Sequence, residues 1–112
     1  MTLNITLSDS EGYLDTVVVD DATNKRCFSY TDNEKNNCEL CVYDDGICLF
    51  KECEDHILEL HLHKNNYAKI TTAEGVIKLD AKVVDFLLND DILVMRYIID
   101  EVERKIEVKY RS

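Results

Sequence analysis

The chain contains no proline, no tryptophan and only three glycines among its 112 residues. Proline lacks a backbone N–H and is confined to the edges of sheets, so its absence leaves every strand free to lie in the middle of a sheet. The few glycines stand far apart, which excludes the glycine-rich loops that hold phosphate groups. No apolar run approaches the roughly 20 residues of a membrane-spanning helix, and we expect no membrane partner.

Basic residues are also scarce, at 13 against 23 acidic ones, and the formal net charge is −10. Such a field repels nucleic acids and anionic membrane surfaces, because lysine and arginine supply most of the affinity for phosphate groups. The segment 1–7 lacks the basic and apolar regions of a signal peptide, which predicts a cytoplasmic protein. Because the cytosol keeps thiols reduced, we do not expect the five cysteines to form a disulfide framework. No motif indicates a cofactor, and we expect none.

Each glycine follows an acidic residue and precedes an extended, apolar-rich run, as a hairpin turn would. Asp45-Gly46 is the strongest of these signals, because a type I′ turn needs positive φ at both central residues. A two-residue turn there places Cys38 directly opposite Cys53 on the paired strands. We therefore expect these two thiols to be neighbours, reduced in the cell and open to oxidation after purification.

Apolar and polar residues alternate along most of the chain, which is the period of a strand with one buried face. The clearest case is the run 57–63, in which three leucines face inward and polar residues face outward. In the long run 76–88 the apolar face changes sides in mid-strand, which indicates a β-bulge. The residues that we expect to be mostly buried are Leu58, Leu60, Leu62, Ile77, Leu79, Val94, Ile106 and Val108.

About eight to ten short strands joined by tight turns are typical of an up-and-down barrel or a sandwich. No change of composition and no linker divides the chain, so residues 1–112 are expected to form a single domain. The prediction is an all-β, antiparallel meander closed into one β-barrel.

Three features of the second half carry a resemblance to a known family. A Thr-x-x-Gly turn, Thr72-Ala73-Glu74-Gly75, opens an alternating strand, the strand 92–99 has a tyrosine near its end, and a short strand, 105–110, closes the pattern. This arrangement, over roughly residues 40–110, resembles the YwiB-like proteins, small bacterial proteins of unknown function. The resemblance implies a calycin or lipocalin-like barrel, which is just wide enough to fill with side chains or to hold one small ligand. It implies no activity.

The chain departs from that family at two places. Ile70 stands where the family often has a tyrosine, and Lys51-Glu52-Cys53 stands where it often has Arg-x-Gly. Lysine cannot offer the planar, bidentate fork of arginine. Lys51 would therefore reproduce only part of any role that the arginine has.

The pair Cys38-x-x-Cys41, followed by Cys48, Cys53 and His56, has the outline of a zinc site. The second pair has the wrong spacing, and residues three apart on a strand point to opposite faces. A thioredoxin-like interpretation also fails, because no helix follows to lower a thiol pKa. Core or surface thiols are the favoured interpretation.

His61 and His63 share one face of a strand, the spacing by which carbonic-anhydrase-type sites hold zinc. Glu59 or His56 could supply a third ligand, and such a site could serve a hydrolase or isomerase at the mouth of the barrel. The histidines alternate with leucines that should face the core. Exposed polar side chains are therefore the favoured interpretation.

Arg96 interrupts the otherwise apolar run 92–99, and arginine is rarely buried without a partner. On a regular strand it shares a face with Val94, which predicts an inward guanidinium near one mouth of the barrel. It should then meet either a buried acid or a bound anion. The candidate acids are Asp80, Asp85 and Glu107. The candidate ligand-binding residues are Arg96, Tyr97 and Lys51.

The basic residues of the C-terminal run alternate with acids and read as a mixed, solvated strand face. These basic residues are Arg104, Lys105, Lys109 and Arg111. With no catalytic signature, the leading hypothesis is a non-enzymatic, cytosolic binding or interaction domain. Its partner would be a small apolar or anionic ligand, or a protein, including a homodimer formed through an exposed strand edge. The competing hypothesis is the histidine-based hydrolase or isomerase.

Overall fold

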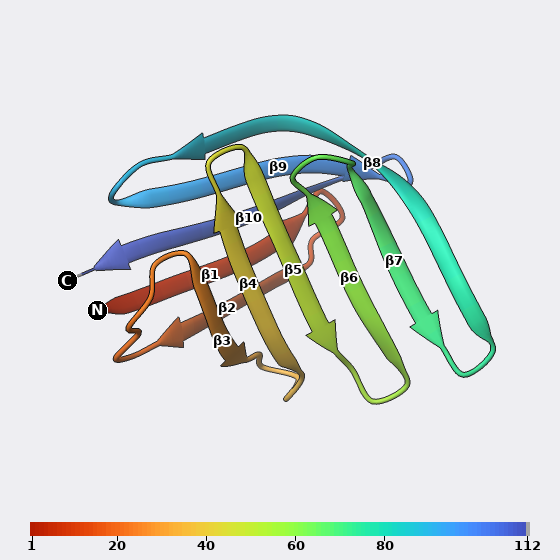
Figure 1. The fold of residues 1–112 in the computed structure, drawn as a ribbon, viewed down its shortest axis with the longest axis horizontal. Helices are drawn as coiled ribbons and strands as arrows, with labels where there is room; N and C mark the ends of the chain where they lie inside the picture. The colour runs from red at the N-terminus through yellow and green to blue at the C-terminus, as the bar shows by residue number, and fades with distance from the viewer. Residues whose placement is uncertain (112) are drawn as a thin grey trace.

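Ten antiparallel strands make up the computed structural model, which describes residues 1–111. Within those residues no helix is long and apolar enough to cross a membrane. Strands that follow one another in sequence pair with each other, except that β2 and β3 do not pair and β1 pairs with β10 (Figure 1). The all-β, antiparallel meander is therefore confirmed. The strands are β1 (Thr2–Asp9), β2 (Leu14–Val19), β3 (Cys27–Thr31), β4 (Asn37–Tyr43), β5 (Gly46–Glu52), β6 (His56–Leu62), β7 (Tyr67–Thr72), β8 (Gly75–Leu88), β9 (Ile92–Ile99) and β10 (Val102–Arg111).

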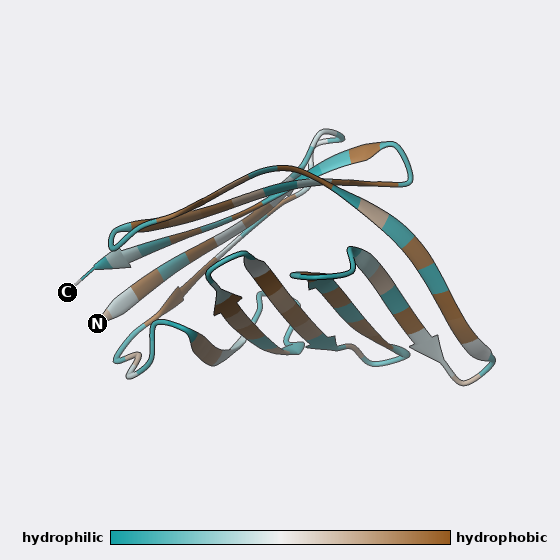
Figure 2. Cartoon of the chain, turned by 45° about the horizontal axis from the view of Figure 1, so that its top comes forward, coloured by the Kyte–Doolittle hydropathy of each residue, from teal (hydrophilic) through white to brown (hydrophobic). Residues whose placement is uncertain are grey.

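The long strand β8 folds the sheet back over itself. Its first part pairs with β7 and its second part with β9, so it belongs to both halves of the sheet (Figure 2). The register shifts between Val83 and Asp85, and the residue between them, Val84, is 44% exposed. Before the shift Leu79 faces inward, and after it Phe86 does. This is the bulge that the mid-strand change of apolar face predicts, and it turns the sheet around a corner.

The two edges of the sheet, β2 and β3, are joined by a side chain instead of a backbone ladder. The amide of Asn33, in the loop after β3, donates to the Asp15 carboxylate at 2.5 Å and to the Thr16 carbonyl at 2.9 Å. The result is a nearly closed β-barrel. An edge strand keeps unpaired backbone groups that can meet another chain, and the homodimer through such an edge stays a prediction.

The core lies between the two halves of the folded sheet, and most of its expected members are found there. Four of the predicted core residues are buried, namely Leu60, Leu62, Ile106 and Val108. Leu58 and Leu79 are half-buried and pack against the same cluster. Ile77 is 55% exposed, which contradicts the prediction, because it lies near the start of β8 at the outer end of the β7–β8 hairpin.

Strand β9 faces the opposite way from the prediction. Its buried residues are Leu93, Met95, Tyr97 and Ile99. Val94 and Arg96 therefore lie on the outer face, and their predicted inward placement is wrong. The strand is apolar on both faces, so its sequence contains no alternation from which the inward side can be read.

The hairpin between β4 and β5 turns one step earlier than predicted. Tyr43 pairs with Gly46, so the turn residues are Asp44 and Asp45. Gly46 is the first residue of β5 and does not have positive φ. It must be glycine because a Cβ there would collide with the backbone carbonyl of Leu62 on β6. Gly46 is therefore required by the close approach of β5 to β6 and not by a turn.

This register also corrects the cysteine predictions. Cys38 lies opposite Lys51 and not opposite Cys53, so the expected direct opposition of Cys38 and Cys53 is wrong. A disulfide instead joins Cys27 to Cys41, which face each other across the β3–β4 pairing. Opposed residues of antiparallel strands bring their Cβ atoms close to bonding range. The physical basis of the prediction holds, but it applies to another pair of strands.

Candidate functional site

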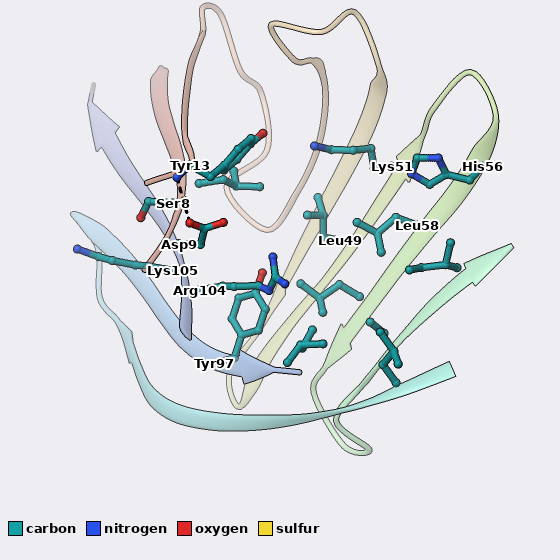
Figure 3. A pocket seen from close by; sticks show the side chains of 16 residues that line it. Ser8, Asp9, Tyr13, Leu49, Lys51, His56, Leu58, Tyr97, Arg104 and Lys105 are labelled. Atoms are coloured by element: carbon teal, nitrogen blue, oxygen red, sulfur yellow. Dashed lines mark hydrogen bonds between the residues drawn. The ribbon is translucent and has the colours of Figure 1, made fainter. Parts of the chain in front are cut away.

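A cavity of about 330 Å³ opens between the two halves of the barrel (Figure 3). This volume lies at the small end of the range for small-molecule sites. Strands β1 and β5 to β10 all contribute to its walls, because alternation turns one face of each strand inward. Its apolar lining consists of Leu7, Leu49, Leu58, Leu60, Ala68, Ile70, Leu79 and Ile99.

Arg104 brings a positive charge into this apolar cavity. It lies on the same face of β10 as the buried residues Ile106 and Val108. None of the ion pairs within residues 1–111 involves its guanidinium. Its Nε is buried and has no hydrogen-bond partner. Buried polar atoms are nearly always hydrogen-bonded to protein or to ordered water, so this Nε is free to donate to a water molecule or to a bound ligand.

Tyr97 lies directly opposite Arg104 in the β9–β10 pairing, and the two side chains stand next to each other in Figure 3. Burial raises the pKa of the Tyr97 hydroxyl to about 12, and the positive charge of Arg104 only partly offsets this. The hydroxyl is therefore neutral at pH 7 and can donate a hydrogen bond. Arg104 and Tyr97 together offer several donors to one group in the cavity.

Lys51 also lines the cavity, but its charge is already paired. Its Nζ lies 3.1 Å from Asp32 Oδ2, and the two side chains are 13% and 2% exposed. Burial alone would lower the Lys51 pKa, but the hydrogen bond and charge of Asp32 outweigh burial and raise it. Burial alone would likewise raise the Asp32 pKa, but the Asn36 N–H and Lys51 outweigh burial and lower it. The pair fixes the loop after β3, and because Asp32 neutralises the Lys51 charge, Lys51 attracts an anionic ligand only weakly.

Asp9 is the acid that the sheet register places opposite Arg104, on the neighbouring strand β1. Its Oδ1 accepts hydrogen bonds from the backbone N–H groups of Glu11 at 2.8 Å and Tyr13 at 3.0 Å. These bonds, chiefly the one from Tyr13, hold the pKa of Asp9 below its usual value. The positive charge of Arg104 also lowers the Asp9 pKa, although the two side chains are not within ion-pair distance. The carboxylate thus organises the β1–β2 turn at the rim of the cavity.

The candidate ligand-binding residues divide between the two faces of the sheet. Tyr97 and Lys51 line the cavity, whereas Arg96 does not. Arg96 Nη2 lies 2.9 Å from Glu103 Oε1 on the outer face, and Glu103 is not one of the acids that the sequence suggested. Arg104 was missed, because its run of alternating charges resembled a solvated face. Its even-numbered spacing from Ile106 and Val108 was the signal that could have identified it.

His61, His63 and Glu59 stand on the outer face of the barrel. Leu60, between them, lines the cavity, so the histidines point away from it. His61 Nε2 lies 3.5 Å from Glu59 Oε1, while His63 stacks on Tyr43. No residue of this set belongs to the group of potential metal ligands that the described chain contains. His56, the other suggested ligand, lies at the rim of the cavity.

Comparison with known proteins adds little. No protein-family model matches the sequence, and no curated protein matches it. Among solved structures, the chain is similar to the crystal structure of the YwiB protein from Bacillus subtilis, at 12% identity and a TM-score of 0.35. The match covers 99% of this chain and 89% of that chain. A likeness this low carries no argument about family or function, so the description of the barrel rests on its own strand pairing.

Proposed function

We propose that the protein is a non-enzymatic binding domain for a small amphipathic anion. The apolar part of the ligand fills the cavity, and its carboxylate or phosphate group pairs with Arg104. The observation that carries the proposal is a guanidinium with a buried, unpartnered Nε in an apolar cavity. A buried hydrogen-bond donor without a partner is costly, and a bound anion that accepts from it removes that cost.

The donors of Arg104 and Tyr97 favour an anionic head group over a neutral or cationic one. The guanidinium has five N–H donors and no acceptor, and it can hold a carboxylate or phosphate with two parallel hydrogen bonds. The neutral hydroxyl of Tyr97 can add a third donor. A purely apolar ligand would exclude water from the cavity and leave Nε without any partner. A cationic ligand would meet the charge of Arg104 at close range.

Calorimetric titration with decanoate tests the proposal, with decanol as the neutral ligand of equal chain length. We expect decanoate to bind and decanol to bind at least about tenfold more weakly, because a hydrogen bond to a charged group contributes about 1.5 to 3 kcal/mol. Arg104→Met should weaken decanoate binding by about tenfold or more. Arg96→Met is the matched control, because Arg96 is an arginine on the neighbouring strand that does not line the cavity.

Three results would overturn the proposal. The first is equal affinity of the wild-type protein for decanoate and decanol. The second is decanoate binding that survives Arg104→Met. The third is no binding of either ligand by a folded wild-type protein.

Two broader predictions accompany this function as proposals. The calycin-like character of the barrel and its kinship with YwiB-like proteins rest on the sequence resemblance over roughly residues 40–110. A cytoplasmic location is the second of these proposals. The histidine-based hydrolase or isomerase has no comparable support, because His61 and His63 lie on the face of β6 away from the cavity.

A further inference from the structure

A row of sulfur and nitrogen ligands crosses the outer face of the barrel. Successive pairings place Cys27 opposite Cys41, Cys41 opposite Cys48, and Cys48 opposite His61. The row therefore runs straight across β3, β4, β5 and β6. At one end Cys48 Sγ lies 3.6 Å from His61 Nδ1. At the other end Cys27 and Cys41 meet a carboxylate, Glu39, two residues along β4.

Cys27, Cys41 and Glu39 form a compact group of potential metal ligands. One ligand atom from each lies within 4.8 Å of the other two. The distance from Cys41 Sγ to Glu39 Oε1 is 3.8 Å. Tetrahedral zinc, with bonds of about 2.3 Å to sulfur and about 2.1 Å to oxygen, separates these two atoms by about 3.6 Å. This edge of the triangle therefore already has the spacing that a zinc ion requires.

We propose that the reduced protein binds Zn²⁺ through Cys27, Cys41 and Glu39, with the fourth position left to solvent. Two thiolates and a carboxylate match the ligand preference of this borderline-soft cation. The ligands stand on two hydrogen-bonded strands, so the sheet holds them in place before the ion arrives. The site is independent of the anion cavity, because Glu39 and Cys41 alternate with the inward-facing residues Cys38, Leu40 and Val42.

The same two sulfurs form the disulfide of the oxidised protein. Reduction of that bond takes two electrons from the reductant and leaves two thiols. A thiol reductant also supplies the two protons and becomes a disulfide, whereas a phosphine becomes a phosphine oxide and water supplies the two protons and the oxygen. Zinc then displaces up to two protons as the thiols bind as thiolates. Metal binding and disulfide formation therefore exclude each other at this position, and the site exists only under reducing conditions.

The test is a titration of fully reduced protein with Co²⁺ as the probe, followed by displacement with Zn²⁺. The protein is reduced with a phosphine in denaturant, refolded without oxygen, and shown to contain five free thiols. We expect one Co²⁺ per chain, with near-ultraviolet absorption from thiolate-to-cobalt charge transfer that Zn²⁺ abolishes. Cys27→Ser and Cys41→Ser should remove this absorption. Glu39→Gln should weaken binding by about tenfold or more, since even groups that only support a metal ligand contribute about that much.

Cys53→Ser is the matched control, because Cys53 is a free cysteine beyond the end of β5. This variant should bind Co²⁺ as the wild-type protein does. The inference is overturned if reduced wild-type protein shows no charge-transfer absorption, if the absorption survives Cys41→Ser, or if Cys53→Ser abolishes it. A protein that binds no metal but forms the Cys27–Cys41 bond on oxidation would have a disulfide pair there and no zinc site.

Discussion

Two arginines on the neighbouring strands β9 and β10 have opposite environments. Arg96 stands on the outer face, where it pairs with Glu103 and both side chains are about two-fifths exposed, at 42% and 41%. Arg104 stands on the inner face, where no acid pairs with it and its Nε has no partner. The same type of side chain forms an ion pair on the outer face in one place and lines a largely apolar cavity without an ion pair in the other. What decides the difference is the face of the strand on which each residue falls.

The largest expected effect concerns the ion pairs of the two faces. Asp32→Asn removes the partner of the largely buried Lys51 side chain and should lower the free energy of unfolding by about 3 kcal/mol, because it leaves that charge uncompensated. Glu103→Gln removes the partner of Arg96 and should cost about 1 kcal/mol or less. Urea denaturation of both variants measures this contrast. Equal losses would show that the Lys51–Asp32 pair is as solvated as the outer one.

The same inner pair predicts a dependence of stability on pH. The pKa of Asp32 is lowered in the folded protein, so its contribution is present above the ordinary value of 3.8 and is lost as the pH falls through the folded pKa. The pKa of Lys51 is raised above 10.5, so its contribution is lost only as the pH rises through that higher value. The stabilities of wild type and Asp32→Asn should therefore begin to converge as the pH falls below 3.8 and should meet below the lowered pKa of folded Asp32. A gap that stays constant down to the lowest pH would contradict the lowered pKa.

Apolar residues of the two environments should also differ. Leu60→Ala should lower the free energy of unfolding by about 2 to 5 kcal/mol, because Leu60 is buried in the core. Ile77→Ala should cost about 1 kcal/mol or less, since more than half of Ile77 is exposed. Thermal and urea denaturation give both values. A loss below about 1 kcal/mol for Leu60→Ala would mean that the cavity, and not packed core, surrounds that side chain.

Arg104→Met should stabilise the protein in the absence of ligand. The substitution removes a buried donor without a partner, and such a group costs about 1 to 3 kcal/mol. Arg96→Met should change stability by less than about 1 kcal/mol in either direction, because its ion pair is exposed. Urea denaturation of ligand-free protein separates the two variants. A destabilised Arg104→Met variant would show that the guanidinium has a structural partner after all.

The smallest expected effect is on nucleic-acid binding. With a net charge of −10, the protein should show no mobility shift with DNA or RNA at physiological salt. Removal of either arginine should change nothing in that assay. A shift at low micromolar protein would indicate a basic groove that neither face of the sheet reveals.

Sequence reasoning succeeded where one face of a strand is apolar and the other is polar. The leucines of β6 and the change of apolar face in β8 predicted the inward residues and the bulge correctly. It failed on β9, which is apolar on both faces, and so Arg96 was placed inside. In β10 the alternation showed correctly that Ile106 and Val108 face inward. The alternating charges near the start of the strand, however, led to Arg104 being placed on a solvated face.

Long-range contacts were beyond the reach of local patterns. Asp45-Gly46 has the composition of a type I′ turn, yet Gly46 is required by the backbone of Leu62 on another strand. The predicted turn therefore placed Cys38 opposite Cys53, whereas the true register places Cys38 opposite Lys51. The pairing of Cys27 with Cys41 depends on the β3–β4 register, which the polar loop between those strands does not reveal. For the same reason, the meeting of Arg104 and Tyr97 in one cavity could not be predicted.

The most direct test of this account follows the Nε–H resonances of the two arginines in ¹⁵N-labelled protein, assigned through Arg104→Met and Arg96→Met. Decanoate should shift the Arg104 resonance and slow its exchange with water, because the ligand supplies the partner that Nε lacks. Decanol should leave it nearly unchanged, and the Arg96 resonance should respond to neither ligand. An Arg104 resonance that is indifferent to decanoate, or an Arg96 resonance that shifts in its place, would contradict the account.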